Sequence, residues 1–260
     1  MAATVAVVGP AMSADRPRIR IEPCPKRIRG YRDGRLVLDS TDVRYVWEVP
    51  YYPAWYVPVA DVRADLKENG EVLRSPRRGD GTRYDLVVDG EVVPDAAWRH
   101  VDSPVAELSD LVRIEWDALD TWFEEEVEVF VHPRSPEVRV DALASSRHVR
   151  VRVAGEVVAD STRPVLLFET GLPTRYYLPK TDVRMERLAP TDTTSACPYK
   201  GEARYWDVTV GGVTHPDLAW SYPTPLPESE AVAGLVCFYN EKVDLEVDGI
   251  MVERPRTKFS

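Results

Sequence analysis

Cysteine and histidine are scarce in this sequence, and neither occurs in a pattern that binds metal. The 260 residues include three cysteines, Cys24, Cys197 and Cys237, and four histidines. An odd number of widely spaced cysteines argues against a disulfide framework and favours a reducing compartment. There is no CxxC pair, and no two histidines stand three or four residues apart, so we expect no metal site.

Motifs that cradle phosphates or present a nucleophile on a sharp turn are also missing. The sequence has no GxGxxG, no GxxxxGKS/T and no GxSxG. These absences leave dinucleotide-binding, P-loop and α/β-hydrolase functions without support. We therefore expect no cofactor.

Positive charge is in deficit. Lys and Arg total 33 against 43 Asp and Glu, which gives a net charge of -10 at pH 7. This balance repels phosphate backbones and anionic lipids, and no long basic run offsets it, so we predict neither nucleic-acid nor membrane binding. Residues 1–15 contain no Lys or Arg and no apolar run long enough for a signal sequence or a membrane span. We expect this segment to be disordered and the protein to be cytoplasmic.

What the sequence does contain is the same domain twice. A shift of 121 residues aligns 34–63 with 155–184 with 11 identities in 30 positions, where chance at ordinary composition gives about two. A shift of 122 aligns 75–98 with 197–220 with 9 identities in 24. The duplication predicts two similar domains. We place the first copy at 16–135, the second at 145–252 and a tail at 253–260.

Short β-branched and aromatic runs, bounded by Gly, Pro or Asp, predict a meander of short strands. Asp33-Gly34, Asp89-Gly90 and Gly211-Gly212 lie between such runs and predict hairpin turns. Helical patterns are confined to 105–111 and 116–125 in the first copy and 228–235 in the second. We predict a mainly β protein with two tandem small antiparallel β domains of similar fold, each with one short helix. The predicted strands are 35–38, 44–49, 85–88, 126–131, 148–153, 165–168, 204–210 and 235–239.

The second copy has a thiol that the first lacks. We interpret the polar segment Thr193–Gly201 as a loop between two strands, and loops often carry function. Cys197 in this segment lies three residues before Lys200, whose ammonium would favour a thiolate, so both are candidate catalytic residues. The first copy has Ser75 in place of Cys197, which fits one active and one structural copy. The alternative is that Cys197 is a small buried hydrophobic residue.

Aromatic and polar residues of the second copy suit a concave small-molecule site. Tyr199, Tyr222 and Arg175 have no counterpart in the first copy and are the stronger candidates. Tyr177 and Trp220 recur in the first copy, which also fits a place in the core. The predicted ligand-binding set is Arg175, Tyr177, Thr194, Tyr199, Trp206, Trp220 and Tyr222.

Four charged positions recur in both copies and are interpreted first as structural. An Asp182–Arg184 pair on one strand face is an example. The alternative is a carboxylate pair for acid–base catalysis. The recurring positions are Glu169, Asp182, Arg184 and Asp207, which match Glu48, Asp61, Arg63 and Asp85.

Several motifs of the second copy occur in order, namely Tyr177-Leu178-Pro179, Asp182-Val183-Arg184, Asp192-Thr193-Thr194, Cys197-Pro198-Tyr199-Lys200-Gly201 and Ala219-Trp220-Ser221-Tyr222-Pro223. In these motifs the chain, from about residue 163 to 249, resembles the uncharacterised domain-of-unknown-function family 427, and the first copy resembles a degenerate member. The resemblance implies a small antiparallel β domain akin to the β-tent group, although the paired CxxC zinc knuckles of many members of that group are missing. The family is sometimes labelled nucleotidyltransferase-like, but no Gly-Ser pair followed by spaced Asp residues is present to hold magnesium.

Three functions remain open. The first is binding of a small polar metabolite in a pocket of the second domain beneath Thr193–Gly201, with Arg175 and Lys200 facing an anionic group and Tyr199 and Tyr222 as walls. The second is a thiol-dependent enzyme that uses Cys197 as nucleophile or redox centre. The third is a structural or interaction protein. The sequence specifies neither the ligand nor the oligomeric state.

Overall fold

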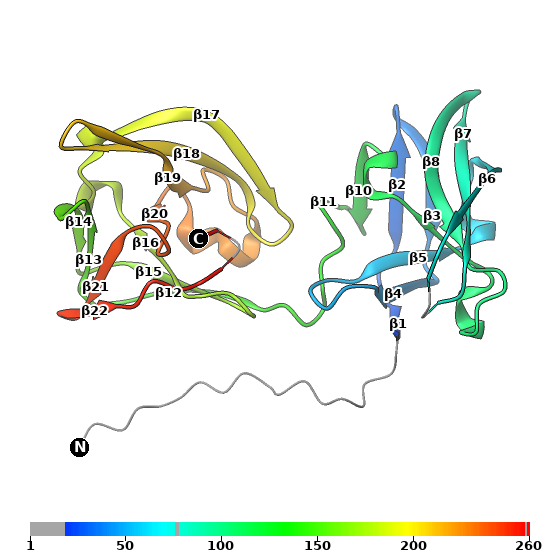
Figure 1. Cartoon of the computed structure of the whole chain (residues 1–260), viewed down its shortest axis with the longest axis horizontal. Coiled ribbons are helices and arrows are strands. Elements are labelled where there is room, and N and C mark those ends of the chain that lie inside the picture. The colour runs from blue at the N-terminus through cyan, green and yellow to red at the C-terminus, as the bar shows by residue number, and fades with distance from the viewer. Residues whose placement is uncertain (1–18, 76–77, 258) are drawn as a thin grey trace, which may run out of the picture. The chain divides into compact units, whose positions relative to one another are not determined.

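The computed structural model describes residues 19–75, 78–257 and 259–260 (Figure 1). The segment 1–15, which we expect to be disordered, lies outside the described residues, as do Pro76 and Arg77. The chain divides into two compact units, Met1–Val127 and Glu128–Ser260, and each contains one of the sequence repeats. Among the described residues, no helix is long and apolar enough to cross a lipid bilayer.

The first unit is built from two sheets. Its strands are β1 (Arg20–Cys24), β2 (Ile28–Arg32), β3 (Arg35–Ser40), β4 (Val43–Trp47), β5 (Ala54–Pro58), β6 (Asp65–Leu73), β7 (Gly81–Val88), β8 (Glu91–Arg99), β9 (Leu111–Ile114), β10 (Thr121–Glu124) and β11 (Val127–Val129). Short 3-10 turns are η1 (Val59–Asp61), η2 (Ala106–Leu108) and η3 (Trp116–Ala118). The large sheet has the order β1-β4-β5-β9-β8-β7-β6, and the small sheet has the order β11-β10-β2-β3.

The second unit repeats this plan. Its strands are β12 (Val140–Ala144), β13 (Val149–Val153), β14 (Glu156–Ser161), β15 (Val165–Glu169), β16 (Arg175–Leu178), β17 (Leu188–Cys197), β18 (Gly201–Val210), β19 (Val213–Ser221), β20 (Val236–Phe238), β21 (Asp244–Val247) and β22 (Ile250–Val252). The 3-10 turns are η4 (Lys180–Asp182), η5 (Met185–Arg187) and η6 (Pro227–Val232). The large sheet has the order β12-β15-β16-β20-β19-β18-β17, and the small sheet has the order β14-β13-β21-β22.

The two strand orders correspond position by position. In the large sheets β12 takes the place of β1, β16 that of β5 and β17 that of β6. Neighbouring strands pair antiparallel in both units, for example β15 with β16 and β4 with β5. The predicted fold class of two tandem antiparallel β domains of similar fold is therefore confirmed.

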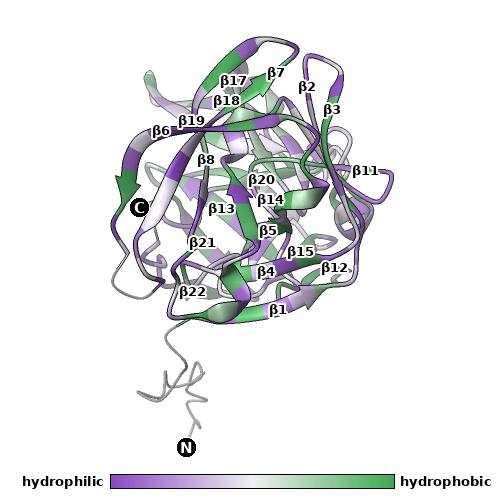
Figure 2. Ribbon diagram, turned by 90° about the vertical axis from the view of Figure 1, so that its right-hand side faces the viewer, coloured by the Kyte–Doolittle hydropathy of each residue, from purple (hydrophilic) through white to green (hydrophobic). Residues whose placement is uncertain are grey.

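Alternation along the strands gives the large sheet of the second unit two different faces. One face packs against the small sheet, where Val149, Val151 and Val153 of β13 are buried. The other face carries Tyr177 and Trp220 and packs against η6. Figure 2 shows the corresponding alternation of hydrophobic and hydrophilic residues along the ribbons. The first face is a wholly apolar core, whereas the second mixes aromatic and polar groups.

The predicted hairpin turns are present. Asp33 and Gly34 have φ of 48° and 73°, and Asp89 and Gly90 have φ of 50° and 89°. Gly211 and Gly212 also have positive φ, at 57° and 79°. Glycine and aspartate tolerate this left-handed conformation better than bulkier residues do, which is why these pairs could be located from the sequence.

The predicted helical windows form only short 3-10 turns, and one window also contains a strand. Residues 105–111 contain η2, and residues 228–235 overlap with η6, which begins at Pro227. Within 116–125, Trp116–Ala118 form the turn η3 but Thr121–Glu124 form strand β10, so one helix through this window is ruled out. Burial in β10 alternates, with Trp122 and Glu124 facing inward, and this period of two is that of a strand.

The polar segment Thr193–Gly201 is not a loop as expected. Its first five residues form the end of strand β17, which runs to Cys197, and only residues 198–200 form the turn into β18. In β17 the side chains from Asp192 to Ala196 are exposed, because β17 is an edge strand of the large sheet. Polar side chains on an exposed edge strand made this stretch look like a loop in the sequence.

The recurring aspartates have structural partners. The Asp207 carboxylate accepts a hydrogen bond of 2.9 Å from the backbone of Asp217, and Asp85 accepts one of the same length from Asp95. Asp217 and Asp95 have positive φ at a bulge, so the carboxylates hold a strained backbone. The expected pair between Asp182 and Arg184 does not form. Asp182 pairs with Arg163 instead.

Candidate functional site

Four of the seven predicted ligand-binding residues lie on the polar face of the large sheet in the second unit. Arg175 and Tyr177 project from β16 on the same side because they are two residues apart. Trp220 lies on β19, and Tyr222 follows directly after that strand. Two tyrosines from neighbouring segments complete the surface. We call Tyr177, Tyr205, Trp220, Tyr222 and Tyr239 the tyrosine face.

The rings of the tyrosine face contact one another and share hydrogen bonds. The Trp220 and Tyr239 ring centroids are 4.5 Å apart. Trp220 Nε1 donates a hydrogen bond of 3.2 Å to the Tyr177 hydroxyl. The Tyr205 hydroxyl lies 2.7 Å from Ser195 Oγ on the edge strand. The aromatic surface therefore carries several hydroxyl groups close together.

The Tyr222 hydroxyl is not used within the fold. The residue is 6 % exposed, and its hydroxyl has no hydrogen-bond partner among the residues that the structure describes. Burial raises the pKa of Tyr222 far above its ordinary range, and nearby Cys197, Tyr205 and Glu169 raise it further. The hydroxyl therefore keeps its proton and can donate a hydrogen bond.

Arg175 forms a buried ion pair on this face. Two of its nitrogens donate hydrogen bonds to the Glu241 carboxylate at 2.7 and 2.8 Å. The Arg175 and Glu241 side chains are 9 % and 0 % exposed. Burial works to raise the pKa of Glu241, but the hydrogen bonds from Arg175 and Thr257 outweigh it and lower that pKa. The guanidinium charge is thus already neutralised within the fold.

Lys200, the predicted partner of Cys197, also forms a buried ion pair within the fold. Its Nζ forms an ion pair with the Glu169 carboxylate, and the two side chains are 11 % and 9 % exposed. Cys197 is half-buried at the end of β17, and the Lys200 backbone N–H donates to its carbonyl at 3.3 Å in the turn. The ammonium of Lys200 therefore faces a carboxylate.

The remaining predicted residues lie elsewhere. The Tyr199 hydroxyl accepts a hydrogen bond of 2.7 Å from the Ser135 backbone, so this side chain fastens the segment before β12. Trp206 faces the apolar core on the opposite side of the sheet. Thr194 is exposed on the edge strand. The structure does not bring these three to the tyrosine face.

Sequence reasoning missed the carboxylates of this site. Glu169 was interpreted first as a recurring structural residue, with acid–base catalysis as the alternative, and Glu241 was not singled out. Glu241 lies in the chain after β20, 66 residues from Arg175, so no local pattern links the two. The only available signal was an arginine on an otherwise apolar strand, because a buried arginine requires an acidic partner.

The first repeat has a related network with different charges. Trp98 Nε1 donates to the Tyr56 hydroxyl at 3.3 Å, and Tyr56 donates to Glu48 at 2.6 Å. Burial raises the pKa of Tyr56 to about 12. Arg78 and Arg113 both pair with Glu48, and by strand register Arg113 occupies the position of Cys237. Two guanidiniums thus converge on one carboxylate in the first repeat.

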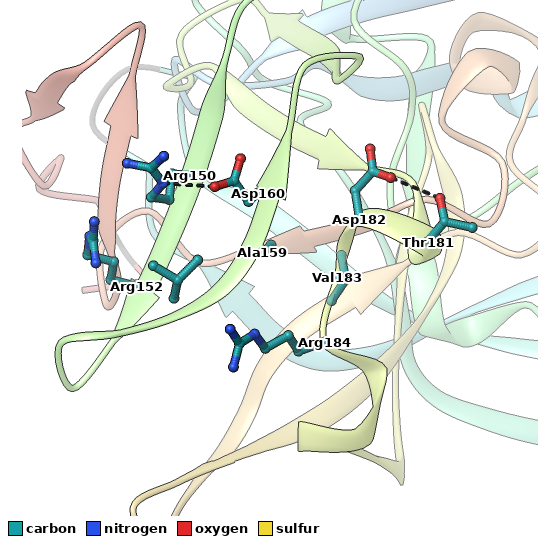
Figure 3. Close-up of a pocket in the computed structure, with 9 residues that line it drawn as sticks. Arg150, Arg152, Ala159, Asp160, Thr181, Asp182, Val183 and Arg184 are labelled. Atoms are coloured by element: carbon teal, nitrogen blue, oxygen red, sulfur yellow. Dashed lines mark hydrogen bonds and ion pairs between the residues drawn. The ribbon is translucent and has the colours of Figure 1, made fainter.

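A separate groove opens on the second unit between the β13–β14 hairpin and the connection from η4 to β17 (Figure 3). Its volume is about 510 Å³. Arg150 and Arg152 project from β13, and Arg184 reaches toward the hairpin from the other side. The lining is Arg150, Arg152, Val157, Ala159, Asp160, Thr181, Asp182, Val183 and Arg184.

Within the described residues, no three His, Cys, Asp or Glu side chains are grouped so as to hold a metal ion. The three cysteines are free thiols. The acidic groups near the tyrosine face are each paired with a cation instead.

Comparison with known proteins gives a family match over most of the chain. The family described as domain of unknown function (DUF427) matches residues 20–125 and again residues 141–249. The two matched segments are the two structural repeats. No curated protein matches the chain.

Proposed function

This chain is a tandem-repeat member of the DUF427 family, and we propose that its second repeat binds a small polar metabolite at the tyrosine face. The observation that carries the proposal is the Tyr222 hydroxyl, which has no hydrogen-bond partner among the described residues although the side chain is 6 % exposed. A ligand atom can accept a hydrogen bond from this hydroxyl without displacing a partner within the fold.

The charges around the face indicate which ligands suit it. Arg175 is paired with Glu241, and Lys200 is paired with Glu169, so both cations are balanced. The sequence led us to expect that these cations would face an anionic group. With the pairs formed, an uncharged ligand suits the face better, because it leaves both pairs intact. The partly buried ring of Tyr239 offers it flat contact area.

The C-terminal tail supports an aromatic occupant. The Phe259 ring lies 5.9 Å from the Tyr239 ring, and the Arg175 guanidinium lies 5.8 Å from the Phe259 centroid. Thr257 Oγ1 donates a hydrogen bond of 2.6 Å to Glu241. A ring with a nearby hydroxyl, supplied by the chain itself, therefore already packs at the border of the tyrosine face.

Ligand-observed saturation-transfer NMR tests the proposal on the full chain. The panel is phenol, benzamide, nicotinamide, uracil and adenine, which are uncharged ring compounds with hydrogen-bonding groups. We expect signals from at least one compound, which decrease in Tyr222→Phe because the ring remains and the hydroxyl is lost. Trp206→Phe, on the opposite face of the sheet, is the control and should leave the signals unchanged. Absence of binding, or equal signals in wild type and Tyr222→Phe, contradicts the proposal.

A further inference from the structure

The groove of Figure 3 contains a cation that the fold does not use. The Arg184 side chain is exposed and has no ion pair or hydrogen bond with any described residue. Its backbone is nevertheless fixed, because its N–H donates to Val158 on β14 at 2.8 Å and its carbonyl accepts from Arg187 at 2.9 Å. The Arg184 backbone is thus held in place, and its guanidinium extends from it into the groove.

The carboxylates that border the groove are balanced by other cations. Asp182 accepts hydrogen bonds from Arg163, which lies outside the lining, and from Ser161. Asp160 pairs with Arg150 at 2.9 Å and also contacts His148. These contacts leave the charge of Arg184 uncompensated.

Arg152 is the second cation of the groove whose guanidinium is not tightly bound by a carboxylate. Its nearest carboxylate oxygen, on Glu246, is 3.7 Å away, and Arg150 already approaches Glu246 at 3.0 Å. Arg152 is therefore held loosely and can turn toward a ligand. Together with Arg184 it places guanidinium groups on both sides of the groove (Figure 3).

The first repeat supplies an internal comparison. It has a smaller groove of about 380 Å³ beside β3, the counterpart of β14, and this groove is lined in part by Arg35 and Arg63. Arg35 pairs with Asp89 at 2.7 Å, and Arg63, at the position of Arg184, pairs with Asp39 at 3.4 Å. The position of Arg152 is occupied by Tyr31. Both arginines of this groove therefore have carboxylate partners.

We propose that the groove between the β13–β14 hairpin and the η4–β17 connection binds the phosphate group of a small molecule through Arg152 and Arg184. Guanidinium groups donate in a fixed fork that matches the oxygens of phosphate. The groove volume of about 510 Å³ leaves room for more than the phosphate group. This site is independent of the tyrosine face, and either site can exist without the other.

Isothermal titration calorimetry on the full chain tests this site, with inorganic phosphate and pyrophosphate as probes at constant ionic strength. We expect one saturable site in the wild type. Arg184→Ala should weaken it by about tenfold or more, because a hydrogen bond to a charged group is lost. Arg152→Tyr, which installs the first-repeat residue, should weaken it as well. Arg63→Ala is the matched control and should leave the affinity unchanged.

Two further measurements complete the test. Thermal melting should be the same for wild type and Arg184→Ala, because the side chain is exposed and makes no contact that the fold needs. Acetate titrated in the same way should bind much more weakly than phosphate. The proposal is overturned if phosphate gives no saturable heat, if Arg184→Ala binds phosphate as the wild type does, or if acetate binds as tightly as phosphate.

Discussion

Trp220 Nε1 donates a hydrogen bond of 3.2 Å to the hydroxyl of Tyr177. The same bond joins Trp98 to Tyr56 in the first repeat, at 3.3 Å. The surroundings of the two tyrosines differ. Tyr56 also donates to Glu48 at 2.6 Å, whereas no further side-chain partner of the Tyr177 hydroxyl is found among the described residues. One conserved pair is thus placed in two different polar environments.

Removing the two hydroxyls should therefore have unequal effects. Tyr56→Phe should lower the free energy of unfolding by about 2–3 kcal/mol, since it takes a donor from the largely buried Glu48. Tyr177→Phe should cost about 1 kcal/mol, because only one bond is lost. Denaturant titrations followed by tryptophan fluorescence measure both values. Tyr51→Phe, at a residue 76 % exposed, is the control. Equal losses for Tyr56→Phe and Tyr177→Phe would argue against this difference.

The Arg175–Glu241 pair should behave as a unit. Arg175→Met alone should cost about 3–5 kcal/mol of unfolding free energy, because it leaves the Glu241 carboxylate buried without its partner. The double variant with Glu241→Leu should cost less than the sum of the two single changes. The first repeat has Ala54 at the position of Arg175, which shows that the fold accommodates a neutral residue there. Additive losses in the double-mutant cycle would contradict this coupling.

Cysteine alkylation should be strongly selective. Burial raises the pKa of Cys24, and it raises the pKa of Cys237 to about 12. Both are buried, whereas Cys197 is half-buried. At pH 8, iodoacetamide should modify Cys197 about a hundredfold faster than Cys237, as followed by mass spectrometry. A Cys197 that reacts as slowly as Cys237 would remove the thiol-dependent alternative.

Acid should weaken the second repeat through Asp182. Hydrogen bonds from Arg163, then Ser161 and Thr181, lower the pKa of Asp182 from 3.8 to about 2. Because the folded-state pKa is the lower one, the stabilisation is present above pH 3.8 and disappears as the pH falls to about 2. Asp182→Asn should therefore be less stable than wild type at pH 6, and the two should converge near pH 2. Thermal melting across this range measures the difference, and a constant difference would exclude this linkage.

Most of the fold could be predicted from the sequence because its signals are local. Strands follow from short β-branched and aromatic runs bounded by Gly, Pro or Asp, and hairpins follow from Asp-Gly and Gly-Gly pairs that adopt positive φ. The duplication predicts that both halves share one topology. The stretch 121–124 lies inside the window 116–125 that the sequence predicts as helical. Its burial, set by tertiary packing, shows a strand.

The site was predictable only in part. Arg175 and Tyr177 share a face because they are two residues apart on one strand. The same rule could have separated Trp206 from Tyr205, since adjacent strand residues face opposite sides. No local rule places the Tyr199 hydroxyl on the backbone of Ser135, 64 residues away. Contacts of this kind depend on how the sheets fold together.

The shared strand order of the two units bears on how the chain avoids misfolding. A strand of one repeat fits the hydrogen-bonding position of its counterpart in the other, and such exchange is a characteristic error of tandem repeats. Inserting β16 in place of β5 would place Arg175 at the half-buried position of Ala54, away from its partner Glu241. Because Arg175 would lose the ion pair that it forms in its own sheet, the unlike interiors of the repeats favour each strand in its own sheet.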